Sequence, residues 1–214
     1  MTTAQSLRGL IKPVVFAAAV VPLARLVLRG VGGELGANPI EVITHATGDW
    51  ILRFLLITLA ITPLRRLTRQ PWLIRFRRML GLFAFFYGCL HFTTYIWLDQ
   101  FFDWANIVKD VQKRPFITAG FTGFVLMLPL AVTSTAWAVR KLGGKRWQWL
   151  HRLIYVSATA GVIHYIWLVK ADLTLPLTYA AILAVLLLYR LAAWGIPALR
   201  ARRARLAQPA AAAR

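Results

Sequence analysis

The sequence has little of what soluble and disulfide-bonded domains contain. Its 214 residues include one cysteine, Cys89, which excludes an internal disulfide, and there is no C-x-x-C-H segment for covalent haem attachment. No H-E-x-x-H, Walker A or G-x-G-x-x-G segment occurs, so three common chemistries lack their motifs. Acidic residues number 7, and charged residues make up 15% of the chain, against roughly 25% in soluble proteins. These shortages exclude an ordinary soluble domain.

What the chain has in abundance is apolar surface. Hydrophobic residues make up 59% of it, and the mean hydropathy is +0.61. A soluble chain of this length could not bury so much apolar surface in a single core. The composition therefore predicts an integral membrane protein with one domain.

Apolar runs long enough to cross a bilayer divide the chain. A transmembrane helix needs about 20 mostly apolar residues, with a range of about 17–25. We predict an all-α integral membrane bundle of six transmembrane helices over residues 13–194, with a cytoplasmic N-terminus (1–12) and a basic, flexible cytoplasmic tail (195–214). No A-x-A cleavage site follows the first run, so we expect it to be retained. The predicted spans are Pro13–Leu28, Trp50–Leu64, Met79–Leu98, Phe116–Ser134, His151–Val169 and Pro176–Trp194.

Basic residues indicate the direction of the spans, because Lys and Arg near span ends stay on the cytoplasmic side. With the N-terminus in the cytoplasm, 19 of the 26 Lys and Arg residues fall on that side and all 7 acids fall on the other. We therefore expect both termini in the cytoplasm. The net charge of +19 then reflects contact with anionic membrane lipid, at about 1 kcal/mol per basic residue near the surface, and no nucleic acid.

Two histidines lie at membrane depth, where an ionisable side chain marks a functional site by default. His91 lies seven residues before Leu98, the outer end of the third span, and His164 lies five before Val169, the outer end of the fifth. These spans run in the same direction, so the two imidazoles share one depth in the outer half of the membrane. Such a pair suits axial ligation of a haem iron from opposite faces. The alternative is that each histidine only hydrogen-bonds between helices.

A glycine precedes each of these histidines by three residues. Residues i and i+3 share a helix face, and a histidine leans toward the turn before it. Gly88 before His91 and Gly161 before His164 would therefore leave room for a flat macrocycle against each helix. Close helix packing is the structural alternative. The matched depth and the repeated G-x-x-H favour haem.

The sequence leaves open whether a second, inner haem is bound. His151 stands thirteen residues before His164, about 20 Å along a helix, which is enough to separate two haems. The matching position on the third span holds Arg77 and Arg78, which are poor iron ligands but good partners for haem propionates. An inner haem could be absent, five-coordinate or bound through another ligand. His151 could also contact a quinone or flavin, or be a purely interfacial residue.

The segment before the second span is polar. We predict an outer loop over residues 38–50, in which Thr47 or Asp49 caps the second helix. His45 in this loop could instead close a site or dock a periplasmic partner. Asp49 and Arg53, at i,i+4 spacing, can pair near the membrane interface.

Four stretches together resemble one family over nearly the whole chain outside its two tails. The family is MsrQ, the haem-binding membrane subunit of the bacterial periplasmic methionine sulfoxide reductase system, within the ferric-reductase-like transmembrane group. The stretches are N-P-x-E-x-x-x-H-x-T-G-x-W (38–50), R-R-M-L-G-L (77–82), G-C-L-H-F-x-x-Y (88–95) and W-x-W-L-H-R-L-x-Y (147–155).

This resemblance implies a multi-pass electron-transfer subunit of the bacterial inner membrane. It implies haem b, one or two per chain, and FMN, to which we can assign no residue. Electrons would come from quinol or from a cytoplasmic flavin reductase. They would pass to a periplasmic molybdopterin-containing methionine sulfoxide reductase catalytic subunit that repairs oxidised envelope proteins. His91, His151 and His164 match the family's haem-histidine positions, whereas the inner position on the third span is not histidine.

Two other functions are alternatives. One is a stand-alone haem protein that reduces metal ions or oxygen, and the other is a small, colourless transporter or assembly factor. The spans lack the Gly/Pro interruptions in symmetry-related halves that mark many transporters. After Trp194 twenty residues follow, too few for a nicotinamide- or flavin-binding domain. We therefore expect the donor to be a lipid quinol or a separate protein, with sulfoxide reduction catalysed by the partner.

Overall fold

The computed structural model describes residues 3–207, and the side chains of residues 10–195. Within that range the chain is helical between short turns and contains no strand, which confirms the all-α class. The α-helices are α1 (Thr3–Val31), α2 (Pro39–Leu67), α3 (Ile74–Thr93), α4 (Trp104–Lys113), α5 (Pro115–Val132), α6 (Ala136–Leu142), α7 (Gly144–Leu150), α8 (Leu153–Leu168) and α9 (Thr174–Ala207). A 3-10 turn, η1 (Pro71–Leu73), precedes α3, and a π-helical segment, η2 (Thr94–Asp99), follows it.

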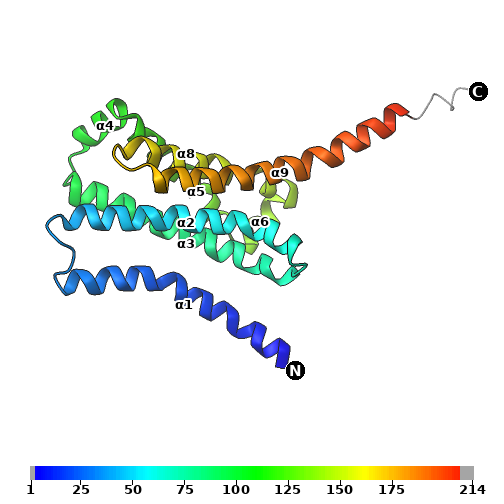
Figure 1. Cartoon of the computed structure of the whole chain (residues 1–214), viewed down its shortest axis with the longest axis horizontal. Coiled ribbons are helices and arrows are strands. Elements are labelled where there is room, and N and C mark those ends of the chain that lie inside the picture. The colour runs from blue at the N-terminus through cyan, green and yellow to red at the C-terminus, as the bar shows by residue number, and fades with distance from the viewer. Residues whose placement is uncertain (1–2, 208–214) are drawn as a thin grey trace, which may run out of the picture.

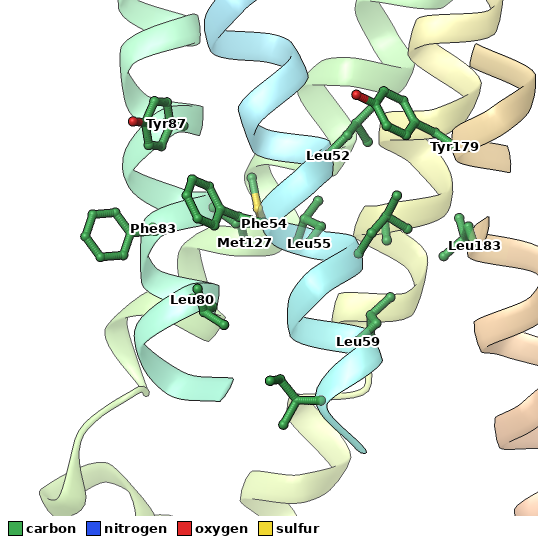
Figure 2. Close-up of a cluster of buried hydrophobic side chains, with 14 of the residues drawn as sticks. Leu52, Phe54, Leu55, Leu59, Leu80, Phe83, Tyr87, Met127, Tyr179 and Leu183 are labelled. Atoms are coloured by element: carbon green, nitrogen blue, oxygen red, sulfur yellow. The ribbon is translucent and has the colours of Figure 1, made fainter. Parts of the chain in front are cut away.

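The helices form an elongated bundle (Figure 1). Two close pairs, α2 with α3 and α5 with α8, make up its centre, and α9 packs against α8 and α2. α1 lies beside α2 and α3 and diverges from them toward its N-terminus (Figure 1). The buried apolar core lies between α2 and α3 and reaches Met127 of α5 and Leu183 of α9 (Figure 2).

Five helical segments among the described residues are long and apolar enough to cross a membrane, so the chain is a multi-pass membrane protein. They correspond to the first, second, third, fourth and sixth predicted spans. The fifth predicted span is α8, whose 16 residues rise about 24 Å, slightly less than a bilayer core requires. α8 is nevertheless paired with α5 inside the bundle. Six crossings with cytoplasmic termini stay a prediction.

The second helix begins earlier than predicted, so the expected outer loop at residues 38–50 is wrong. Asn38 caps α2 by accepting a hydrogen bond from the backbone N–H of Glu41 at 3.3 Å, and its amide donates to the Glu41 carboxylate at 2.9 Å. Pro39 occupies the first helical position, which suits its fixed φ. His45 therefore lies on a helix. The hydropathy of this stretch is too low to reveal a helix that starts outside the apolar span.

Two other boundaries differ from the prediction. α3 ends at Thr93, and the rest of the third predicted span is the π-helical η2. α9 continues as one helix to Ala207, past the expected boundary at residue 195. Residues 208–214 of the predicted tail lie outside the described residues.

The ion pair predicted at the start of the second span is confirmed. Asp49 and Arg53 approach to 3.3 Å within α2. The Arg53 guanidinium also donates to the Tyr179 hydroxyl at 2.9 Å and lies 4.8 Å from the ring centre of Trp50. The same arginine therefore joins α2 to α9.

A tyrosine of α3 ties α1 to the bundle. The Tyr87 hydroxyl accepts a hydrogen bond from the Leu23 N–H at 3.1 Å and donates to the Ala19 carbonyl at 3.0 Å. In a regular helix these two backbone groups would bond to each other, so the hydroxyl is inserted into the hydrogen-bond ladder of α1, beside Pro22. Tyr87 is only 1% exposed. A single buried hydroxyl thus sets the position of α1 against α3.

We expect Tyr87→Phe to loosen α1. The variant loses two hydrogen bonds and can regain one within α1, a net loss of about 1 kcal/mol in the free energy of unfolding. Equilibrium unfolding in mixed detergent micelles measures this loss, and limited proteolysis reports the accessibility of α1. Tyr189→Phe, at a partly buried tyrosine of α9, is the control. Equal stability and equal proteolysis of the Tyr87 variant and the unaltered protein would contradict the role of this hydroxyl.

α2 carries a proline in its interior, and an arginine of α9 compensates for it. Pro63 has no N–H, so the carbonyl of Leu59 lacks the donor that a regular helix provides. The Arg190 guanidinium donates to that carbonyl at 2.9 Å and lies 5.1 Å from the ring centre of Tyr155. Arg190 is 7% exposed. This buried contact links α9 to α2 where the backbone ladder of α2 is interrupted.

Arg190→Met should lower the free energy of unfolding by about 1–3 kcal/mol because it leaves the Leu59 carbonyl without a donor. The loss should shrink in a Pro63→Ala background, where residue 63 supplies the missing N–H. Equilibrium unfolding of the four proteins in this double-mutant cycle measures the coupling. Identical losses in the two backgrounds would show that Arg190 does not compensate for the proline.

Candidate functional site

A cavity of about 690 Å³ lies between α2, α3, α5 and α8. Its walls are mainly apolar, and Ile107 and Val111 of α4 line it where α4 meets the bundle. Cofactor sites in proteins are typically apolar cavities of about 300–1,000 Å³ with a few polar groups that converge on the ligand. The polar groups that decide the chemistry here are His91 of α3 and His164 of α8, which both line the cavity.

The ring of His91 is held by the backbone of α2. Its Nδ1 lies 3.0 Å from the Thr44 carbonyl oxygen and 3.4 Å from the Thr47 hydroxyl. A carbonyl oxygen can only accept, so Nδ1 carries the ring proton and donates it. In the neutral imidazole the other nitrogen, Nε2, therefore keeps its lone pair available for a ligand.

His164 is held in the same way by a different helix. Its Nδ1 lies 2.6 Å from the carbonyl oxygen of Phe116, in the first turn of α5. Nδ1 therefore donates, and Nε2 of His164 also keeps its lone pair. Metal-ligating histidines almost always donate their second ring N–H to a carbonyl or carboxylate, which fixes both tautomer and ring orientation. Both histidines are thus arranged as metal ligands.

The two imidazole rings lie close together. Their centroids are 6.2 Å apart and their planes cross at 84°. A metal ion bound to one nitrogen of each ring at about 2 Å would place the centroids roughly 6 Å apart. Two imidazoles supply the two ligands that a protein must provide when a planar macrocycle supplies the other four. The geometry therefore fits an iron porphyrin between His91 and His164.

Two glycines that the sequence analysis missed allow these rings to pack against neighbouring helices. A Cβ atom at Gly120 of α5 would lie 2.7 Å from Nδ1 of His164, and one at Gly48 of α2 would lie 3.2 Å from Cε1 of His91. A 2.7 Å approach is closer than real Cβ atoms make, so no other residue fits at position 120 without displacing His164. The available signal was weak: Gly48 falls within the stretch that resembles the MsrQ family, and Gly120 falls in none of the four.

The glycines that were predicted, Gly88 and Gly161, line the same cavity. They also lie in tight helix contacts. A Cβ atom at Gly88 would approach Met127 Cε to 3.1 Å, and one at Gly161 would approach Leu52 Cδ2 to 3.1 Å. Close helix packing therefore accounts for both glycines. Their position on the cavity wall is also compatible with making room for a flat macrocycle.

His151 lies apart from the cavity. It is the C-terminal cap of α7, on the turn that precedes α8, and its ring stacks on Trp147 with centroids 3.8 Å apart. Its Nε2 lies 3.1 Å from the Thr133 hydroxyl, which itself donates to the Pro129 carbonyl at 2.6 Å. Since that hydroxyl has only one proton, Nε2 of His151 is the donor in their contact.

Of the two predicted arginines, one lies near His151 and the other lies at the surface. Arg77 is partly buried and close enough for its charge to act on both His151 and Arg190, whereas Arg78 is exposed. Within the described residues, His151, Arg77 and Arg78 are not among those that line the cavity of His91 and His164.

Charged and polar groups line the cavity on the side of the first turn of α2 and of α4. His45, on α2, is exposed there. Glu41, Asp99 and Arg114 line the same part of the cavity. This side of the cavity can therefore receive the polar edge of a ligand whose body lies against the apolar walls.

Comparisons with known proteins agree with a multi-pass helical membrane protein. The family model described as "Ferric reductase like transmembrane component" matches residues 47–162, so the chain is of the ferric reductase-like transmembrane class. The chain is 61% identical to the "Protein-methionine-sulfoxide reductase heme-binding subunit MsrQ" of Herminiimonas arsenicoxydans over 183 residues, 85% of this chain and 84% of that protein. Proteins of the same name from Ralstonia nicotianae and Bordetella pertussis are each 54% identical, over 87% of this chain and 87% and 91% of their own lengths. The chain belongs to the MsrQ family.

Proposed function

We propose that this chain binds haem b between His91 and His164 and carries electrons across the bacterial inner membrane. The observation that supports this most directly is the shared tautomer. Each imidazole donates Nδ1–H to a backbone carbonyl, of Thr44 and of Phe116, and leaves Nε2 free in one cavity. Relatives that match most of the chain are named heme-binding subunits, which agrees with this proposal.

The residues of the chain have three tasks in this function. When bound, haem supplies a one-electron iron couple. His91 and His164 would hold the iron, while the Thr44 and Phe116 carbonyls keep both rings in position. The apolar cavity walls, among them Leu52 and Phe124, exclude water from the site. Gly88 and Gly161 complete the wall on the two helices that carry the histidines.

We further propose the direction of transfer. Six crossings with both termini in the cytoplasm put His91 and His164 in the periplasmic half of the membrane. Electrons then enter from quinol or a cytoplasmic flavin reductase and leave to a periplasmic molybdopterin-containing methionine sulfoxide reductase catalytic subunit. That partner system agrees with the names of the relatives, which are subunits of protein-methionine-sulfoxide reductase. FMN stays a prediction without assigned residues.

An inner haem at His151, with Arg77 and Arg78 near its propionates, also stays a prediction. Nε2 of His151 is engaged with the Thr133 hydroxyl, so the ligand nitrogen would be Nδ1, or the contact with Thr133 would have to break. The haem stoichiometry decides the matter. Two haems per chain would support an inner site, and one haem per chain would restrict binding to His91 and His164.

Spectroscopy of the purified chain tests the proposal. The protein is purified in detergent from haem-replete cells, and spectra are recorded before and after reduction by dithionite. We expect a b-type spectrum, with the haem quantified as its pyridine haemochrome. A colourless preparation that takes up no added haem would overturn the proposal and favour the transporter or assembly alternative.

A further inference from the structure

One guanidinium lies among the side chains that line the cavity. Of the residues that the structure describes along its walls, Arg114 is the only lysine or arginine. It is exposed on its outer side, so its guanidinium lies where the cavity meets the surface. A permanently charged group with five N–H donors is the side chain best suited to bind carboxylates.

The guanidinium is held in place by a buried acid. Nε of Arg114 lies 3.3 Å from Asp110 Oδ1, one turn earlier on α4, and Asp110 is 7% exposed. The other carboxylate oxygen of Asp110 accepts a hydrogen bond from the Tyr95 hydroxyl at 3.5 Å, which ties α4 to η2. Among the residues that the structure describes, none hydrogen-bonds to the two terminal nitrogens of Arg114. Those nitrogens are therefore available to a ligand in the cavity.

The acids that line the cavity each have a partner of their own. Glu41 accepts from Asn38 at 2.9 Å, and Asp99 accepts from Gln100 at 2.8 Å. Asp49 is paired with Arg53 at 3.3 Å. The negative charge of these three acids is thus partly offset by their partners, and Arg114 is the group in this part of the cavity that can donate to a carboxylate.

Arg114 also lies in the corner that orients a proposed iron ligand. It ends α4 and begins α5 with an extended backbone (φ −111°, ψ 98°), the conformation imposed by the following Pro115. The next residue, Phe116, provides the carbonyl that accepts from His164 at 2.6 Å. Three consecutive residues thus position both a cation for the ligand edge and the ring of His164.

We propose that Arg114 binds the carboxylates of the porphyrin and so fixes its orientation, with the carboxylate edge toward the corner between α4 and α5. This inference rests on the proposed haem site, because it assigns the residue that recognises the polar edge of the same group. Asp110 acts as a positioning residue that presents the guanidinium of Arg114. The apolar edge of the porphyrin then lies against the opposite, uncharged wall of the cavity.

The test compares two forms of the same macrocycle. The haem-free full-length chain in detergent is titrated with iron protoporphyrin IX and with its dimethyl ester, which lacks the two negative charges. We expect the unaltered protein to bind the free acid about tenfold or more tightly than the diester, the factor expected for a charge-assisted hydrogen bond. Arg114→Gln should lose this preference through weaker binding of the free acid, while diester binding is unchanged. Arg114→Lys should keep part of it.

The control is Lys113→Gln, which removes the same charge from the neighbouring, exposed position outside the cavity lining. It should keep the full preference. Equal affinity of the unaltered protein for the two forms, or an undiminished preference in Arg114→Gln, would overturn the role of Arg114 while leaving the haem site intact. Failure to bind either form would instead overturn the proposed haem site. Unchanged diester binding by Arg114→Gln shows that the variant is folded.

Discussion

We expect the replacement of His91 by alanine to abolish stoichiometric haem binding. The change removes one of the two imidazole nitrogens that would hold the iron, and the Thr44 carbonyl loses its donor. Loss of an outer hydrogen bond to a ligand already costs 10–100-fold in metal affinity, so we expect loss of the ligand itself to weaken binding by at least about 100-fold. His164→Ala should behave in the same way, because its ring is held equivalently by Phe116. Haemochrome quantification after purification measures the loss.

Chemical rescue separates loss of the ligand from loss of the fold. Free imidazole fits the space left by the deleted side chain, so it should restore haem binding to His91→Ala. His45→Ala is the matched control, since that histidine lines the same cavity but is exposed. Its haem content should equal that of the unaltered protein. Full haem retention by both single variants, His91→Ala and His164→Ala, would disprove the ligand assignment.

A single methyl group at Gly120 should be nearly as damaging as loss of a ligand. The Cβ atom of alanine would lie 2.7 Å from Nδ1 of His164 and 3.0 Å from Cε1, so the imidazole must move away from α5. That movement breaks the hydrogen bond to the Phe116 carbonyl and turns Nε2 from its position. We expect Gly120→Ala to lower haem affinity by about 10–100-fold, the range for disturbed ligand orientation.

Three alanine substitutions form a graded series for this test. Gly48→Ala brings a Cβ atom to 3.2 Å from the ring of His91 and should have an intermediate effect. Gly81→Ala on α3 meets only the Thr58 methyl group at 3.7 Å, an ordinary contact, and is the control. Haem titration of the three variants should rank Gly120 first, Gly48 second and Gly81 last. Equal affinities across the series would show that close approach of the glycines does not position the histidines.

The histidine pair could be predicted from the sequence because two simple rules give the depth of each histidine in the membrane. The apolar runs give the ends of the spans, and the distance of each histidine from an outer end gives its depth. The 6.2 Å separation of the rings agrees with this reasoning. Which nitrogen is free could not be predicted, because the acceptors, Thr44 and Phe116, lie 47 and 48 residues away in sequence.

Other features were hidden for similar reasons. α2 begins at Pro39 because Asn38 and Glu41 cap it, which is a local signal that hydropathy does not record. Gly48 and Gly120 face histidines of other helices. Their role is therefore apparent only once α2 packs against α3 and α5 packs against α8. The local polar residues could have revealed where α2 begins. The role of the two glycines can be seen only in the tertiary structure.

Electron paramagnetic resonance of the oxidised, purified protein is the most direct test of the central claim that one iron is held between His91 and His164. Two imidazole ligands make ferric haem low-spin, and ring planes that cross at 84° should give the highly anisotropic form of the low-spin signal. We expect that signal, and we expect His164→Ala to lose it. A high-spin signal from the unaltered protein, or a low-spin signal that survives His164→Ala, would contradict ligation by this pair.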